Sequence, residues 1–190
     1  MSQRWLIAAL VIIAVVQVAV PVTMIVQREA IVQTGRPYKF RTRPVDPADA
    51  FRGRYVGLAF EQDHAPYGSR DELQPDMELF GRVEEAADGF AVVREVTAAP
   101  PDHGDYLKVQ THGWYKEHGG VVHFTLPFDR YYLEETQAPQ AVQAYLEKNR
   151  RNSTNSDTYA VVRIKDGDAA LVDLSVGGKP IQDYFPSRKP

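Results

Sequence analysis

Hydrophobic and polar positions follow two different patterns along this chain. Residues 5–27 contain no charged side chain and lie between Arg4 and Arg28. After residue 28, apolar and polar residues instead alternate in short runs separated by Gly, Pro and Asp. The first pattern is typical of a membrane-spanning helix and the second of β-strands. The sequence therefore predicts one apolar N-terminal helix followed by a mainly β domain.

The apolar run is long enough to cross a bilayer. At about 1.5 Å per residue, a helix over these 23 residues covers the roughly 30 Å hydrocarbon core. A cleaved signal peptide and a buried globular helix are the alternatives. However, the run exceeds the usual signal length of about 7–15 residues, and no Ala-x-Ala site follows it. We expect an uncleaved anchor over residues 5–27 behind a tail of residues 1–4. Its notable positions are the interfacial Trp5 and the tolerated Gln17, Pro21 and Thr23.

Charge divides the rest of the chain into two parts. Residues 28–43 carry five basic groups and one acid, whereas residues 44–190 carry sixteen basic and twenty-four acidic groups. We interpret residues 28–43 as a juxtamembrane linker, attracted to anionic lipid headgroups by about 1 kcal/mol per basic residue near the surface. The acidic surplus of residues 44–190 argues against nucleic-acid binding. The basic residues of the linker are Arg28, Arg36, Lys39, Arg41 and Arg43.

Two opposing arguments bear on the orientation of the anchor. The basic residues after the span favour a cytoplasmic domain by the positive-inside rule. Long domains, however, cross the membrane largely regardless of charge, and a four-residue tail before an apolar run resembles an export signal.

The remainder reads as one antiparallel domain, a β-barrel or a sandwich-like arrangement with one short helix. Asp166-Gly167-Asp168 and His118-Gly119-Gly120 are hairpin signals. The helix is expected after Thr136, with Pro139 in its first turn and Val142, Tyr145 and Leu146 on one face. The expected strands cover residues 38–42, 54–61, 77–83, 90–97, 106–115, 121–128, 159–165 and 169–176.

The most distinctive segment lies between residues 43 and 60. Asp46 and Asp49 favour turns, and Gly53 can open the strand that follows. In that strand Val56, Leu58 and Phe60 alternate with polar or small residues. With the anchor before it and the closing hairpin after it, this segment resembles the GDYXXLXY family of uncharacterised, membrane-anchored bacterial proteins.

The motif of that family falls on named positions of this chain. Gly53, Tyr55 and Leu58 match it, whereas Arg54 replaces its acid and Phe60 its final tyrosine. A catalytic or metal-binding role of that acid would be lost here. We interpret the motif as architectural, with Leu58 and Phe60 pointing into the core.

No arrangement of residues indicates catalysis or a metal site. Cysteine is absent, and a tight turn near residue 119 would pair position 112 with 125 or 127, which separates His112 from His123. We therefore expect no metal and no cofactor. The histidines are His64, His103, His112, His118 and His123.

Three functions stay open. The first is a non-catalytic extracytoplasmic domain that binds an integral membrane or envelope partner; the exterior placement rests on the signal-like N-terminus of the resembling family. The second is a membrane-bound hydrolase with the shape of a signal peptidase. Residues 28–60 lack the serine such an enzyme needs, and the remaining candidates are Ser69, Ser153, Ser156, Ser175 and Ser187. The third is a small-ligand binder whose barrel mouth is lined by Tyr55, Trp114, Tyr131 and Tyr132.

Overall fold

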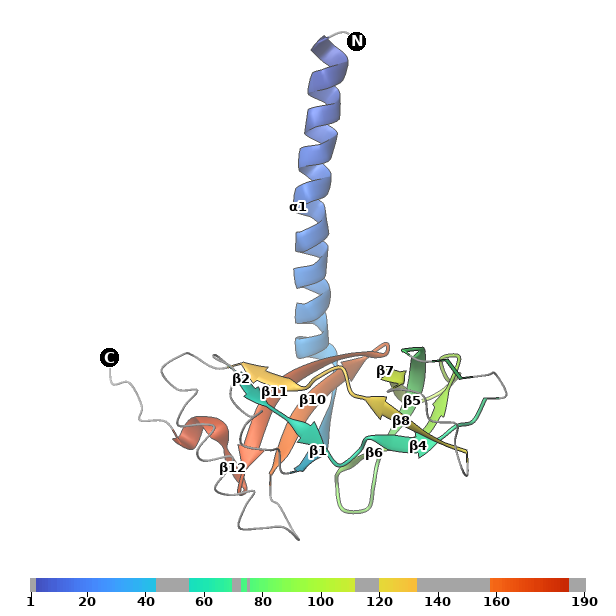
Figure 1. Ribbon diagram of the computed structural model, residues 1–190. Coiled ribbons are helices and arrows are strands. Elements are labelled where there is room, and N and C mark those ends of the chain that lie inside the picture. The colour runs from blue at the N-terminus through green and yellow to red at the C-terminus, as the bar shows by residue number, and fades with distance from the viewer. Residues whose placement is uncertain are drawn as a thin grey trace.

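The fold consists of one long helix standing on a β-domain (Figure 1). The computed structural model describes residues 3–43, 55–69, 73–74, 76–111, 120–132 and 158–184. Helix α1 (Gln3–Thr34) is long and apolar enough to cross a membrane, a property that signal sequences share. Its most apolar 18-residue window has no buried residue, and Ile31 is the one buried residue of the described helix. The prediction of one apolar N-terminal helix is confirmed.

Proline does not interrupt α1. Pro21 lies inside the helix, although its missing N–H removes one backbone hydrogen bond. Two residues later the Thr23 hydroxyl donates to the carbonyl of Ala19, 2.7 Å away. Such local side-chain bonds keep polar groups satisfied inside the helix, which is what an apolar environment requires.

Within its described residues, the β-domain contains two five-stranded sheets and one two-stranded ribbon, all built from antiparallel ladders. The first sheet has the order β12-β11-β10-β1-β3 and the second has the order β4-β8-β7-β5-β6. The first comprises β12 (Lys179–Pro180), β11 (Asp168–Val176), β10 (Tyr159–Lys165), β1 (Arg36–Arg43) and β3 (Ala59–Phe60). The second comprises β4 (His64–Pro66), β8 (Val121–Thr125), β7 (Asp105–Thr111), β5 (Glu78–Glu85) and β6 (Ala91–Thr97). The ribbon pairs β2 (Tyr55–Gly57) with β9 (Arg130–Tyr132), and a 3₁₀ helix, η1 (Ile181–Tyr184), follows β12.

The second sheet curls until its two edge strands approach one another. Tyr67, just after β4, forms an isolated bridge with Val96 of β6, and the Gly68 N–H donates to the Val96 carbonyl at 2.9 Å. No continuous ladder joins these edges, so the described strands form no closed barrel. The expectation of a mainly β, antiparallel domain is confirmed.

A shared core joins the sheets, and its centre is aromatic. Phe40 of β1, Phe60 of β3 and Phe128 after β8 are all buried, and their rings meet edge to face with centroids 5.2–6.3 Å apart. Such contacts stabilise beyond their buried area by about 0.5–1.5 kcal/mol per pair. Because these three phenylalanines come from different parts of the chain, their contacts tie the first sheet to the segment that follows β8.

The segment expected as one motif strand is divided between two sheets. Val56, Leu58 and Phe60 are buried, as their alternation predicts. However, β2 pairs with β9, whereas β3 pairs with the end of β1. Leu58 lies between them, and its N–H donates to the carbonyl of Asp129 at 2.8 Å. The burial pattern was right and the single strand was wrong, because alternation reports burial and not pairing partners.

Other boundaries also differ from the predictions. Residues 28–34 complete α1 and residues 36–43 form β1, so the expected linker is regular structure throughout. Gln110 and Thr111 pair with Thr125 and Phe124, so position 112 is not the partner of 125 as expected. The helix expected after Thr136 and the turn at His118-Gly119 lie outside the described residues.

Candidate membrane-facing site

The helix and the domain meet without a flexible connection. Only Gly35 separates α1 from β1, and its N–H donates to the Ile31 carbonyl at 2.9 Å. A Cβ at position 35 would lie 2.5 Å from that carbonyl oxygen and 3.1 Å from Arg163 Cβ. Glycine is therefore required because the end of the helix and strand β10 approach too closely for a side chain.

The β10–β11 hairpin holds the base of the helix through long basic side chains. Arg163 Nη1 donates to the carbonyls of Gln33 (3.3 Å) and Gly35 (3.2 Å), at the helix end where carbonyls have no intrahelical partner. Lys165 Nζ of the hairpin donates to Thr34 Oγ1 of the helix at 2.8 Å, and Arg28 Nη1 of the helix donates to the Ala169 carbonyl of the hairpin. We call Arg28, Arg163 and Lys165 the helix clamp.

A tight turn shapes the hairpin that carries this clamp. Asp166 (φ 52°) and Gly167 (φ 83°) both have positive φ, and Lys165 pairs with Asp168 across them. This is the geometry of a type I′ hairpin turn, which the sequence Asp-Gly favours. Gly167 also accepts a hydrogen bond from Lys108 N at 2.9 Å, which joins the turn to the second sheet.

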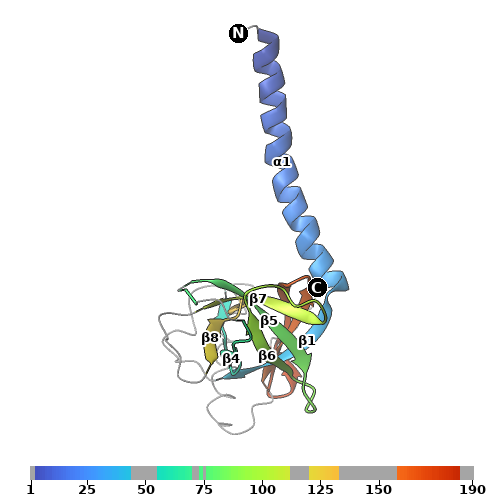
Figure 2. The same ribbon diagram turned by 90° about the vertical axis from the view of Figure 1, so that its right-hand side faces the viewer.

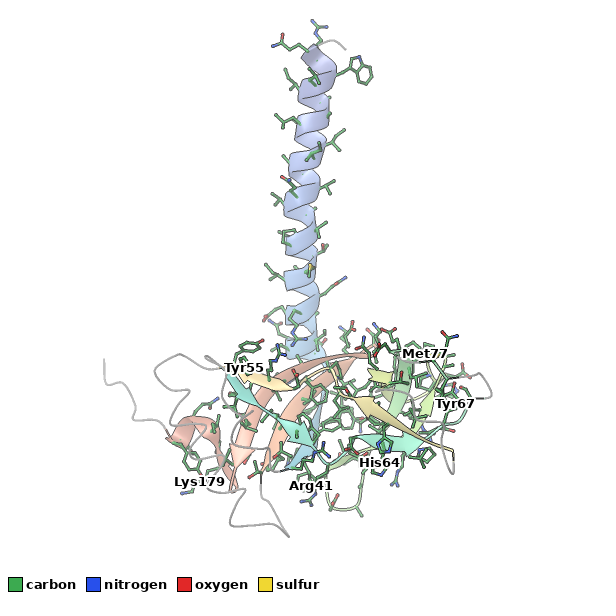
Figure 3. All side chains as sticks on the ribbon, viewed as in Figure 1. Arg41, Tyr55, His64, Tyr67, Met77 and Lys179 are labelled. Carbon is green, nitrogen blue, oxygen red and sulfur yellow. The ribbon has the colours of Figure 1, made fainter. Side chains whose placement is uncertain are left out.

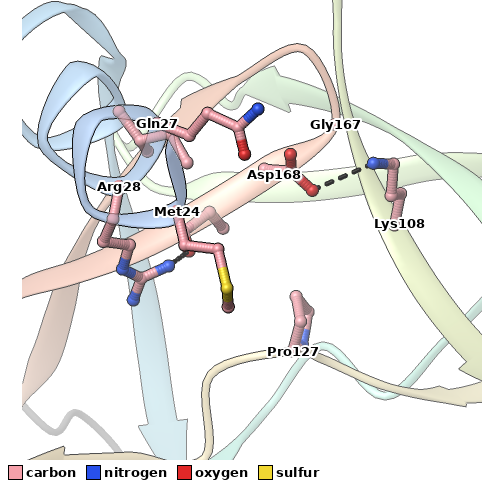
Figure 4. Close-up of a pocket in the computed structure, with 9 residues that line it drawn as sticks. Met24, Gln27, Arg28, Lys108, Pro127, Gly167 and Asp168 are labelled. Carbon is pink, nitrogen blue, oxygen red and sulfur yellow. Dashed lines mark hydrogen bonds and ion pairs between the residues drawn. The ribbon is translucent and has the colours of Figure 1, made fainter. Parts of the chain in front are cut away.

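A cavity of about 310 Å³ lies beside the clamp, between the base of α1 and the domain (Figure 4). Figure 4 shows Met24 and Arg28 of α1 on one wall, Lys108 and Asp168 on another, and Pro127 on a third. Lys108 Nζ lies 3.0 Å from Asp168 Oδ1, and this hydrogen bond raises the pKa of Lys108. The cavity thus combines apolar walls with Arg28 and with the Lys108–Asp168 ion pair, at the level where the apolar helix enters the domain.

An aromatic and basic patch occupies the β2–β9 ribbon on the same side of the domain. Tyr55 and Tyr132 are cross-strand neighbours with ring centroids 5.7 Å apart, and the guanidinium of Arg130 lies 5.2 Å from the Tyr55 ring centroid. Tyr132 is 67% exposed, and among the described residues of the β-domain it is the only exposed large hydrophobic side chain. Figure 3 places Tyr55 at the edge of the domain from which α1 leaves. We call Tyr55, Arg130 and Tyr132 the tyrosine patch.

Most basic residues of β1 lie away from the base of α1, and three of them pair with acids of the same domain. Arg36 contacts Asp105 at 3.3 Å and Arg41 contacts Asp88 at 3.2 Å. Strand β1 runs away from the base of α1 (Figure 2), and Figure 3 places Arg41 at the end of the domain remote from the helix. Lys39 lies over the ring of Tyr159 at 5.5 Å, and Arg43 lies 2.7 Å from Asp63. Only Arg28 and Arg36 of the five expected lipid contacts therefore remain near the helix base.

The structure brings together two histidines that sequence spacing did not connect. His64 of β4 pairs directly with His123 of β8. Asp63 accepts from His64 Nδ1 at 2.7 Å and from Arg43 at 2.7 Å. Although partial burial works in the opposite direction, these bonds hold the pKa of Asp63 below its ordinary value. His103 is exposed in a loop.

The candidate serines of the described residues bond to the backbone. Ser69 Oγ accepts from Ala98 N at 2.9 Å, and the buried Ser175 Oγ donates to the Lys179 carbonyl at 3.4 Å. Several other predicted positions lie outside the described residues: Asp46, Asp49, Gly53, Arg54, His112, Trp114, His118, Ser153, Ser156 and Ser187. Sequence reasoning named Arg28 only as a juxtamembrane basic residue and missed Arg163, Lys165 and Lys108. The only local signal was the Lys165-Asp166-Gly167-Asp168 turn.

Comparison with known proteins gives one match. The family model described as "GDYXXLXY protein" matches residues 17–174, from the middle of the apolar helix to near the end of the closing hairpin. No curated protein matches, and no solved structure matches.

Proposed function

Because the chain belongs to the GDYXXLXY protein family, whose model matches residues of both the apolar helix and the β-domain, we propose the following function. The protein is a single-pass, non-catalytic membrane protein whose β-domain lies on the extracytoplasmic face. There the domain binds an integral membrane or envelope partner.

One observation carries this proposal: the helix clamp fixes the β-domain to the end of an apolar helix. A domain on a flexible linker samples all orientations, whereas a one-residue connection, three hydrogen bonds between α1 and the hairpin and a fourth from the hairpin to Gly35 allow little freedom. The side of the domain around the cavity and the tyrosine patch therefore faces the headgroups. A partner that reaches this face must itself be in the membrane or at its surface.

The clamp also supports retention of the helix after export. Cleavage near residue 27 would leave Arg28 and Ile31 on a helix of only about two turns, and so short a helix is marginal without the turns that precede it. A domain that uses the end of its apolar helix as a structural element is better suited to an anchor than to a removable signal.

The composition of the tyrosine patch supports contact at the membrane interface. Tyrosine and arginine are enriched at headgroup level and in the centres of protein interfaces, since both combine apolar surface with polar tips. Tyr132 is the exposed member of this pair of rings, so it is the position to probe.

A topology test decides the placement. A reporter active only outside the cytoplasm and one active only in the cytoplasm are fused separately after Pro190. Activity of the exterior reporter alone is expected. Activity of the cytoplasmic reporter alone would contradict the extracytoplasmic placement and show that the basic residues after the span set the orientation.

Photo-crosslinking tests the partner. A photoreactive amino acid replaces Tyr132 in cells, with the same substitution at Lys179 as the control. Lys179 is exposed, and Figure 3 places it at the end of the domain remote from α1. We expect one crosslinked protein with predicted membrane spans from position 132 only. Equal products from both positions, or lipid alone from position 132, would contradict a specific protein partner.

The cavity favours a second candidate, a small envelope ligand. About 310 Å³ is near the lower end of ligand-pocket volumes. Tyr55, Tyr131 and Tyr132, the expected lining of a barrel mouth, do not line this cavity. A Lys108→Ala variant compared with the wild type in anionic and zwitterionic lipid nanodiscs tests this candidate. Stabilisation by anionic lipid that the variant loses would support it.

A further inference from the structure

A cluster of metal-ligating side chains lies at the edge of the second sheet. Asp63, His64 and His123 each offer one ligand atom, and these atoms lie within 4.8 Å of one another. We propose that these three residues bind a divalent transition-metal ion of the zinc type. The proposal does not depend on the function proposed above, because this cluster is separate from the helix clamp and the cavity.

Strand pairing explains why the two histidines converge. His64 and His123 are directly opposed in the β4–β8 ladder, where neighbouring Cβ atoms lie about 4.5–5.5 Å apart. Their ring centroids are 5.5 Å apart and the planes are inclined by 43°. Two imidazoles on one face of a ladder can therefore point their nitrogens at a common position without a change in the backbone.

The distances require only side-chain rotation. Ligand atoms around a tetrahedral zinc ion, with bonds of about 2.0–2.2 Å, lie about 3.3–3.6 Å apart. The present spread of up to 4.8 Å is larger. The His64 side chain is 55% exposed, and His123 is exposed as well. Exposed rings change rotamer at little cost, so both can close on an ion.

Asp63 is already held in position for such a site. Its carbonyl accepts from Phe124 N at 2.9 Å, which fixes the residue beside β8. Oδ1 lies 2.7 Å from His64 Nδ1, and Oδ2 lies 2.7 Å from Arg43 Nη1. A metal ion bound to Oδ1 and to the His64 imidazole would take the place of the proton in this hydrogen bond, while Oδ2 would still accept from Arg43. That arginine opposes a cation nearby, so the site is expected to be weaker than a structural zinc site.

The donor set indicates the class of metal and the character of the site. Imidazole nitrogen suits zinc, nickel and copper, whereas magnesium and calcium prefer oxygen ligands. Two histidines and one carboxylate leave a coordination position for water or for a group of another molecule. Figure 3 shows His64 on the lower part of the domain, away from α1, so an ion would be reached from the aqueous side.

Zinc titration of the full-length protein in detergent tests this proposal. Isothermal calorimetry with Zn²⁺, and with Mg²⁺ for comparison, is performed on the wild type and on His64→Gln, His123→Gln and Asp63→Asn. His103→Gln is the matched control, because His103 is an exposed histidine outside the cluster. Circular dichroism checks that every variant is folded.

We expect one zinc ion per chain and an affinity at least about 10-fold lower in each cluster variant. His103→Gln should bind zinc as the wild type does, and X-ray absorption spectra at the zinc edge should show scattering from two imidazoles in the wild type and from at most one in His64→Gln or His123→Gln. The absence of zinc binding by the wild type would overturn the proposal. Unchanged affinity in His64→Gln or in His123→Gln would overturn it equally.

Discussion

At the residue scale, Gly167 combines two demands that only glycine meets. Its φ of +83° is unfavourable for other residues, and a Cβ there would strike the ring of Tyr106. Gly104 has a similar φ of +87°, but a Cβ there would meet nothing within 4 Å. The two positions therefore separate the cost of backbone conformation from the cost of steric overlap.

We predict that Gly167→Ala lowers the free energy of unfolding by about 2–4 kcal/mol, because it adds overlap with Tyr106 to the strain of positive φ. Gly104→Ala should cost only the backbone term of about 1–2 kcal/mol. Chemical denaturation of the full chain in detergent measures both. Equal losses would show that the Tyr106 ring moves aside freely.

A buried tyrosine predicts a loss of stability at alkaline pH. Burial, followed by the hydrogen bond that its hydroxyl donates to Asp105 at 2.7 Å, raises the pKa of Tyr38 to about 12. In the unfolded chain it is near 10. The folded state holds the proton more tightly, so this contribution is complete below pH 10 and is lost as the pH rises from 10 towards 12.

We expect the stability difference between the wild type and Tyr38→Phe to shrink by about 2 kcal/mol or less over that range. The other tyrosines titrate in both proteins, so their contributions to the pH dependence cancel in this difference. Thermal unfolding at closely spaced pH values between 9 and 11.5 measures it. A difference that stays constant with pH would mean that Tyr38 is more accessible to water than its 5% exposure indicates.

At the element scale, the helix clamp couples α1 to the β10–β11 hairpin. We predict that Arg163→Met leaves the carbonyls of Gln33 and Gly35 without their partner and destabilises the helix end by about 1–3 kcal/mol. Arg94→Met, which removes the exposed pair with Glu84, should cost about 0–1 kcal/mol. Hydrogen exchange of residues 28–35 is the direct measurement. Equal exchange in both variants would contradict a clamping role.

Sequence patterns predicted individual elements better than their pairing. Strands β10 and β11 and the turn between them follow from alternation and from Asp166-Gly167, because these signals are local. The division of residues 55–60 between two sheets depends on β9, more than 70 residues away, and alternation carries no information about such a partner. The meeting of His64 with His123 is hidden from spacing rules for the same reason.

At the scale of the whole molecule, the direct junction between helix and strand determines which surface of the domain surrounds the base of the apolar helix. We predict that inserting Gly-Ser-Gly-Ser between Thr34 and Gly35 leaves the domain folded and abolishes the specific crosslink from position 132. The same insertion after Gly89, in the turn between β5 and β6, is the control and should preserve that crosslink. Retention of the crosslink in both proteins would show that orientation does not matter for partner binding.

The membrane-facing site as a whole was only partly accessible from the sequence. The apolar helix and Tyr55 and Tyr132 were identified as candidates, because hydropathy and residue type are local properties. Lys108, Arg163 and Lys165 are ordinary basic residues of β-strands until the fold places them beside α1. Arg163 and Lys165 act through contacts across 128 and 131 residues of chain, and Lys108 through a contact across 60, separations that no short pattern encodes.

The stiff junction at Gly35 has a mechanical consequence. In the transmembrane arrangement proposed above, the uncharged run of 23 residues measures about 34 Å as a helix, slightly more than the roughly 30 Å of an average hydrocarbon core, so the helix would accommodate the excess by tilting. A flexible hinge would let the β-domain keep its orientation when the helix tilts, whereas the helix clamp makes the domain tilt together with the helix. A thicker bilayer would bring the helix upright and rotate the domain with it, so that the angle at which the tyrosine patch meets its surroundings follows the thickness of the membrane.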